Sequence, residues 1–257
     1  MTHSPTRDPV DVLVVAAHPE ELCALESQLR ELDPRERRGA GSLEQARSME
    51  ARIAGPTVRA LPTGVGLAAA STGTALAIER MQPRVMILVG SCGAYPTTAG
   101  LRVGDLVQAE RVLLADLAVA RGEAALVAAT DQVLGTDSAL RKTLGEHGAS
   151  RSVWVANTLG ITTSDSAAQL LGATTGCAVE NLEAFGVALA AAAASIPCAV
   201  VLGGTNVVRS EARPQWRQHR EQAAFKTARL VCTWLEHGAR KWLDAGPGAV
   251  SQQHRSG

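Results

Sequence analysis

Hydrophobic positions along the chain fall into short uninterrupted runs that alternate with longer amphipathic or alanine-rich stretches. Three of these runs, at residues 11–17, 85–89 and 198–202, have the length of a β-strand. A continuous apolar run of this length is typical of a strand buried on both faces, as in a sheet covered by helices. Each run borders a stretch with helical periodicity, so the pattern predicts an α/β fold.

The weaker patterns fill in further elements. Shorter apolar runs predict strands at 58–61 and 124–128, and a strand followed by a loop at 153–163. Helical spacing predicts helices at 22–29, 67–80, 137–146 and 215–243, and the charged stretch 35–52 predicts an exposed strand or loop pair. A long alanine-rich helix is expected to open with Glu180, Asn181 and Glu183 and to end at Pro197, which cannot continue a helix.

Composition narrows the architecture. Among 257 residues, 46% are hydrophobic but only 3% are aromatic, so small aliphatic side chains are expected to pack the helices closely on the sheet. We find no repeat and no linker that would divide the chain. The pattern therefore predicts one domain at 11–245, a disordered leader at 1–10 and a disordered tail at 246–257.

Charge and cysteine usage exclude several classes of protein. The formal net charge is zero, which argues against a nucleic-acid partner, and no basic amphipathic stretch indicates a membrane surface. The uncharged stretch 184–204 is interrupted by Ser195 and Pro197, so it is expected to form a buried helix and strand. The five cysteines are scattered without a C-x-x-C pair, which favours a reduced, cytoplasmic protein. The histidines lack ligand-like spacing, so neither a metal nor another cofactor is predicted.

Polar side chains stand where the predicted strands end. Ser91 follows the run 85–89, Asn206 follows the run 198–202, and Glu183 stands at a helix start. Ligands in open α/β sheets bind at the carboxyl ends of strands, so these groups predict a binding site. Glu20 and Glu21 open the helix after the run 11–17, where acidic residues also serve simply as caps.

Several of these segments resemble one superfamily. The sequence V-E-N-L-E-A at 179–184 is similar to the V-E-N-M-E-G segment of futalosine hydrolases, and T-N-V-V at 205–208 with Trp216 is similar to their S-N-x-V segment and tryptophan. T-G-V-G at 63–66, G-S-C-G at 90–93 and G-D-L-V at 104–107 resemble motifs of the wider nucleoside phosphorylase and nucleosidase superfamily. The resemblance implies a single-domain, three-layer α/β/α fold around a central mixed twisted sheet, and a homodimer or larger homo-oligomer. Asp105 is expected to hold a turn.

The resemblance also implies roles for individual residues. Glu21, with Glu20 as the alternative, would position the attacking water, Glu183 would bind the ribose hydroxyls, and Asn206 would face the purine. Residues that would contact the substrate are Ser91, Gly93, Ile161, Thr162, Thr163, Asn181, Leu182 and Glu183.

Two departures from the superfamily pattern point to the reaction. Leu88 stands where the phosphorylases carry an arginine for phosphate, so water becomes the expected nucleophile. Asn206 replaces the usual aspartate; an amide suits the acceptors of a 6-oxopurine better than the exocyclic donor of adenine. The expected function is therefore purine nucleoside hydrolysis resembling futalosine hydrolase in menaquinone biosynthesis. The alternatives are a methylthioadenosine/S-adenosylhomocysteine nucleosidase, a purine nucleoside phosphorylase and a nucleoside-binding protein without turnover.

Overall fold

The computed structural model describes residues 9–34, 37–38, 48–128 and 131–246. The leader expected at 1–10 and the tail expected at 246–257 lie almost entirely outside these ranges. Most of the expected strand or loop pair at 35–52 lies outside them as well.

Ten strands make one mixed sheet in the described part of the chain. The strands are β1 (Val12–Ala16), β2 (Arg37–Arg38), β3 (Met49–Arg52), β4 (Thr57–Pro62), β5 (Val85–Ala94), β6 (Leu106–Leu114), β7 (Val133–Gly135), β8 (Arg151–Asn157), β9 (Val179–Asn181) and β10 (Cys198–Val207). The helices are α1 (Pro19–Leu32), α2 (Leu67–Met81), α3 (Leu117–Ala120), α4 (Ser138–Gly145), α5 (Asp165–Thr175), α6 (Ala184–Ala193), α7 (Ala212–His237) and α8 (Ala239–Ala245).

Half of this sheet closes on itself. The pairing runs β10-β6-β8-β9-β5 and returns to β10, so these strands form a ring. β5 also pairs with β1 in parallel, and β4, β3 and β2 extend the sheet beyond β1. The predicted mixed, twisted sheet is confirmed, and the ring adds a closure that hydrophobic runs alone do not indicate.

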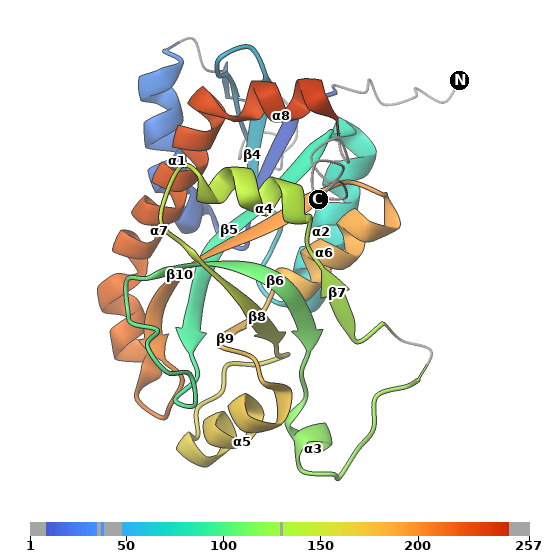
Figure 1. Cartoon of the computed structure of the whole chain (residues 1–257), viewed down its shortest axis with the longest axis vertical. Coiled ribbons are helices and arrows are strands. Elements are labelled where there is room, and N and C mark those ends of the chain that lie inside the picture. The colour runs from blue at the N-terminus through green and yellow to red at the C-terminus, as the bar shows by residue number, and fades with distance from the viewer. Residues whose placement is uncertain (1–8, 35–36, 39–47, 129–130, 247–257) are drawn as a thin grey trace, which may run out of the picture.

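The two faces of the central strands are buried in two separate clusters. Val12 and Val14 of β1 pack into the cluster that contains side chains of α1, α4, α7 and α8. Leu13 and Val15 pack into the cluster that contains side chains of α2 and α6. Figure 1 shows these two groups of helices on opposite sides of the sheet. Burial on both faces explains why these strands are continuous apolar runs, and it confirms the predicted three layers.

The contact between α7 and β10 depends on one glycine. A Cβ atom added to Gly203 would stand 2.6 Å from the Cβ of Ala223 on α7, a separation that side chains do not adopt. The absence of a side chain at Gly203 therefore lets α7 pack closely on β10 near the end of the strand, where Asn206 follows.

Three predicted elements differ from the structure. Residues 124–128 form no strand, and the neighbouring strand is β7, which pairs with β6. The sequence V-E-N at 179–181 does not open a helix but forms β9 between β5 and β8, and α6 begins only at Ala184. The C-terminal helix expected at 215–243 is interrupted at Gly238, which separates α7 from α8.

Candidate active site

A candidate site lies where β1, β5, β9 and β10 end and where the turn after β4 approaches α6. Glu21 comes from the start of α1, Ser91 from β5, and Asn181 and Glu183 from β9 and the residues after it. Hydrogen bonds join Glu21 to Ser91, 70 positions away, and Ser91 to Asn181, 90 positions further along the chain. We refer to Glu21, Ser91, Asn181 and Glu183 as the carboxylate edge.

The first turn of α1 separates two neighbouring glutamates. His18 is the N-cap: its side chain accepts from the N–H of Glu20, and its own N–H donates to Glu21 Oε2 at 3.3 Å. Ser91 Oγ donates to the other oxygen, Glu21 Oε1, at 3.3 Å. Glu20 is exposed and forms an ion pair with Arg220. Glu21 therefore belongs to the carboxylate edge, whereas Glu20 belongs to a surface pair.

Glu183 is the N-cap of α6, yet its carboxylate does not cap the helix. Asn181 does so instead, because its Oδ1 accepts from the N–H groups of Glu183 and Ala184 at 2.9 and 2.8 Å. Glu183 Oε1 accepts from the N–H of Gly66 at 2.9 Å, and Oε2 accepts from Asn181 Nδ2 at 3.1 Å. A carboxylate oxygen can accept more than one bond, so both oxygens retain acceptor capacity.

Asn181 and Ser91 connect the two glutamates. Asn181 Nδ2 donates to the carbonyl oxygen of Ser91 at 3.0 Å as well as to Glu183. The carbonyl and amino groups of Asn181 are both engaged within the protein, and the amino group holds the carboxylate of Glu183. Direct contact of Asn181 with a substrate stays a prediction.

Burial is the main electrostatic influence on the carboxylate edge. Burial and, to a lesser extent, the negative charge of Glu183 raise the pKa of Glu21 from 4.5 to about 7, against the bonds from His18 and Ser91, which lower it. Burial also raises the pKa of Glu183, against the bonds from Gly66 and Asn181. Two carboxyl groups that disfavour each other's charge are held together here, a pattern that is common at catalytic sites.

Trp216 on α7 also reaches this site, although the predicted site residues did not include it. Its Nε1–H donates to Ser91 Oγ at 3.3 Å, and the Arg220 guanidinium lies 5.1 Å from the ring centroid. The resemblance of Trp216 to a family tryptophan was the available signal, but its contact with Ser91 depends on how α7 packs on β10.

Asn206 lies beside the carboxylate edge rather than within it. Its Oδ1 accepts from Thr205 Oγ1 at 2.8 Å, and its Nδ2 donates to the carbonyl oxygen of Val207 at 3.2 Å. A carbonyl oxygen can only accept, so this bond identifies which end of the amide carries the nitrogen. A Cβ atom on Gly93 would lie 2.8 Å from Asn206 Nδ2. Gly93 therefore makes room for the amide of Asn206.

The loop after β8 is attached to β9 through a second buried carboxylate. Glu180 accepts from the N–H of Thr162 at 3.0 Å, from the Thr162 hydroxyl, and from the Tyr95 hydroxyl at 3.1 Å. Ile161 and Thr163 on either side are exposed. Thr162 is thus fixed by a network that the site prediction missed, even though Glu180 stands within the quoted V-E-N-L-E-A motif.

Two further residues discussed from the sequence, Leu182 and Asp105, lie in the structure as follows. Leu182 is half-buried between Asn181 and Glu183, and its carbonyl oxygen accepts from Asn157 Nδ2 at 3.0 Å. Asp105 accepts from the N–H of Arg102 at 2.9 Å, which confirms its expected role in holding a turn.

Among the described residues, no group of three or more His, Cys, Asp or Glu side chains could hold a metal ion. None of the helices in the described ranges is long and apolar enough to cross a membrane.

The family model described as the Phosphorylase superfamily matches residues 11–236. A curated relative, the 5'-methylthioadenosine/S-adenosylhomocysteine nucleosidase of Listeria monocytogenes serotype 4b, is 39% identical over 67 residues. This match spans 26% of the present chain and 28% of the relative's length. A nucleosidase of the same name from Listeria welshimeri is 37% identical over 67 residues, with the same coverage.

Solved structures share the fold over most of their length. The nucleosidase of the same name from S. pneumoniae, with a transition-state inhibitor, aligns with a TM-score of 0.76 and 18% identity, over 88% of this chain and 98% of that one. A futalosine hydrolase mutant from Helicobacter pylori aligns with a TM-score of 0.76 and 14% identity, over 87% and 97%. At these identities the comparison establishes the fold, and it is equally close to both kinds of enzyme.

Proposed function

The chain belongs to the Phosphorylase superfamily, and on that basis we propose that it is a purine nucleoside N-ribosyl hydrolase. The observation that carries this proposal is the joining of Glu21 and Glu183 through Ser91 and Asn181. Breaking a ribosyl–purine bond requires a group that holds the sugar and a group that activates water, and two carboxylates meet these needs.

Glu183 is proposed to hold the ribose. Its two oxygens are oriented by Gly66 and Asn181, and each can still accept a hydrogen bond from the 2'- or 3'-hydroxyl. As the sugar becomes oxocarbenium-like, the negative charge of the carboxylate stabilises the developing positive charge. Leu182, half-buried beside it, would contact the sugar.

Glu21 is proposed to activate the water. A pKa of about 7 lies close to a neutral working pH, where a general base is most effective. The water oxygen forms a bond to C1' as the C1'–N9 bond breaks, and the water proton passes to Glu21. The bonding electrons leave with the purine, which takes its proton from solvent because an asparagine cannot supply one.

Asn206 is proposed to select the base. One N–H of its Nδ2 donates to Val207, which leaves the second N–H for an acceptor on the substrate. A 6-oxopurine presents O6 and N7 as acceptors, so the amide favours a hypoxanthine base such as that of futalosine. Thr162, together with its exposed neighbours Ile161 and Thr163, would contact the other side of the base.

Water is favoured over phosphate as the nucleophile. Leu88, which occupies the position of the phosphorylase arginine, is 2% exposed in the interior of β5 and offers no cation. Arg220 lies near the carboxylate edge through Trp216, but it is engaged by Glu20. Neither Leu88 nor Arg220 therefore offers a free cation that would compensate a phosphate dianion at this site for its lost hydration.

A second candidate is a methylthioadenosine/S-adenosylhomocysteine nucleosidase, which the local identity to the Listeria enzymes favours. This candidate uses the same glutamates but releases adenine. A homodimer or larger oligomer, a cytoplasmic location and a single folding domain over 11–245 are further proposals. Light scattering and limited proteolysis would test the first and the last of them.

The proposal is tested by incubating the purified protein with futalosine, inosine and methylthioadenosine, each with and without phosphate, and measuring the released base. Phosphate-independent release of hypoxanthine from futalosine is expected. Adenine as the main product would contradict the role given to Asn206 and would favour the second candidate. Nucleoside binding without release of any base would leave a binding protein as the function.

A further inference from the structure

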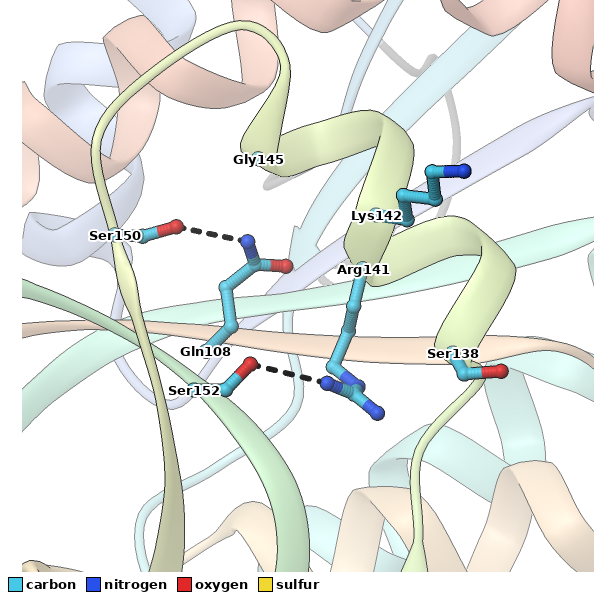
Figure 2. A pocket seen from close by; sticks show the side chains of 7 residues that line it. All are labelled: Gln108, Ser138, Arg141, Lys142, Gly145, Ser150 and Ser152. Carbon is cyan, nitrogen blue, oxygen red and sulfur yellow. Dashed lines mark hydrogen bonds between the residues drawn. The ribbon is translucent and has the colours of Figure 1, made fainter.

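A second polar cavity lies on the sheet face covered by α4. It has a volume of about 350 Å³ and lies between α4 and the first residues of β6 and β8 (Figure 2). Ligand pockets for small molecules begin at about 300 Å³. The cavity, here called the α4 pocket, is lined by Gln108, Ser138, Arg141, Lys142, Gly145, Ser150 and Ser152.

Gln108 leaves a polar atom without a partner inside this pocket. The side chain is 4% exposed, its Nε2 donates to Ser150 Oγ at 2.8 Å, and its Oε1 has no hydrogen bond. Turning the amide over would only exchange the two atoms, because Ser150 faces just one of them (Figure 2). A buried amide atom without a hydrogen bond destabilises the fold, so it indicates that something else satisfies it.

Arg141 has unused capacity as well. Its Nη1 donates to Ser152 Oγ at 3.1 Å, but its buried Nε has no partner. Lys142, on the next position of α4, is exposed at the rim of the pocket, and in Figure 2 its side chain extends away from Gln108. The lining contains these two cations and no carboxylate, and within the described ranges neither cation takes part in an ion pair.

We propose that the α4 pocket binds a phosphorylated polyol or sugar. A phosphate monoester carries a charge of about −1.5 to −2 near neutral pH, which suits two cations without a competing carboxylate. Its oxygens accept from the guanidinium of Arg141 and from the serine hydroxyls. A phosphate dianion has no proton for Gln108 Oε1, so that atom selects a ligand that also carries a hydroxyl group.

This site is separate from the carboxylate edge. The two share no residue, and their charges have opposite sign. The proposal for the α4 pocket therefore does not depend on the proposed hydrolysis, and either can fail while the other holds.

The test is a titration followed by NMR, with glycerol 3-phosphate, inorganic phosphate and glycerol as probes and the backbone amide of Gly145 as reporter. Saturable shifts are expected with glycerol 3-phosphate, weaker ones with phosphate and none with glycerol. Arg141→Leu should weaken glycerol 3-phosphate binding about tenfold or more, because it removes a charge-assisted bond. Arg229→Leu, at an exposed arginine of α7, is the matched control and should leave binding unchanged.

Gln108→Leu separates the two parts of the ligand. It should lower the affinity for glycerol 3-phosphate but leave the affinity for inorganic phosphate nearly unchanged, because it removes only the acceptor for the hydroxyl group. Absence of a saturable shift, or equal affinity in Arg141→Leu, would overturn the proposal. So would binding that survives Arg141→Leu but is lost in Ser91→Ala, since the anion would then occupy the carboxylate edge. A crystal soaked in glycerol 3-phosphate that shows only water in the pocket would contradict it as well.

Discussion

The carboxylate edge and the α4 pocket both contain residues from the ring of strands, but they differ in how far their polar groups are hydrogen-bonded within the protein. In the carboxylate edge, two acids with raised pKa are held by hydrogen bonds from Ser91, Asn181 and Gly66. The α4 pocket is lined by two cations and an amide, and two of their buried atoms, Gln108 Oε1 and Arg141 Nε, have no hydrogen-bond partner. The first arrangement suits the hydrolysis proposed above, whereas the second leaves two buried polar atoms without a hydrogen bond, which suits the proposed phosphorylated ligand.

The difference shows how hydrogen-bond satisfaction distinguishes kinds of site. Each oxygen of Glu183 accepts one of the hydrogen bonds that hold it, and each can accept another from a substrate hydroxyl. The orphaned amide of Gln108 has no such internal network beyond Ser150. Mutations at the carboxylate edge should therefore reduce turnover. Mutations at the α4 pocket should reduce ligand affinity and have little effect on folding.

The largest effect is expected from Glu183→Ala. Removing the carboxylate that holds the ribose and stabilises the developing positive charge should lower kcat/KM by about 10³-fold, within the range known for lost electrostatic stabilisation. Base release from futalosine measures it. Glu123→Ala, which removes an exposed glutamate elsewhere, is the matched control and should retain full activity. A Glu183→Ala enzyme within tenfold of wild type would refute the ribose role.

The next effect is expected from Glu21→Gln, which keeps the shape but removes the base. The loss in kcat/KM should be about 10²-fold or more. Because Glu21 must be deprotonated to accept a proton, wild-type kcat/KM should fall about tenfold per pH unit below its pKa of about 7. The residual kcat/KM of the variant should not fall with pH in this range. If it still fell in Glu21→Gln, the titration of a different group would be responsible.

Asn181→Ala tests the positioning of Glu183. It leaves the N–H groups of Glu183 and Ala184 without their partner, so the free energy of unfolding should fall by about 1–3 kcal/mol. The reduction in kcat should exceed any change in KM, because Glu183 is misplaced rather than removed. Steady-state kinetics and urea unfolding give the two readouts. A loss of stability with unchanged kcat would mean that Asn181 only caps α6 and does not position Glu183 for catalysis.

A smaller effect concerns pH and stability. The folded state binds the Glu21 proton more tightly than the unfolded chain, because the pKa rises from 4.5 to about 7 on folding. This contribution is complete below pH 4.5 and is lost as the pH rises through about 7, so the free energy of unfolding should be lower by about 2–3 kcal/mol at pH 7 than at pH 4.5. Urea unfolding at pH 4.5 and 7 should show a smaller decrease in Glu21→Gln. Equal decreases in both proteins would mean that burial does not shift Glu21.

The smallest effect is expected from Gln108→Leu in the α4 pocket. The substitution removes an unpaired amide atom together with the single bond to Ser150. These changes offset each other, so the free energy of unfolding should stay within about 1 kcal/mol of wild type. A loss several times larger would show that Gln108 serves the fold, and the contrast with the carboxylate edge would disappear.

Burial on both faces made the central strands predictable from the sequence. Residues 12–17, 85–89 and 198–202, which belong mostly to β1, β5 and β10, are apolar at every position because helices cover each face of the sheet. β9 was misread because its three residues are fixed by pairing with β5 and β8, which a local pattern cannot reveal. α5 was overlooked although Ser164 caps its start and Gly176 ends it in a left-handed conformation, so a usable signal was present.

The carboxylate edge could be predicted in part for a similar reason. Glu183 stands within the segment V-E-N-L-E-A, and Glu21 opens the helix that follows the first apolar run, so both could be proposed from the sequence. The capping role of Asn181 and the contact of Trp216 with Ser91 depend on tertiary packing. The α4 pocket had no local signal, since Gln108, Arg141 and Ser150 come together only through the register of β6 with β8 and the placement of α4.

The two glutamates of the carboxylate edge are proposed to direct water to a purine nucleoside. The initial rate of hypoxanthine release from futalosine, measured as phosphate is raised from zero, tests this role in wild type and in Glu21→Gln. The wild-type rate should be independent of phosphate, and the rate of the variant should be at least about 10²-fold lower. A rate that rises in proportion to phosphate, or one that is unchanged in Glu21→Gln, would rule out this role.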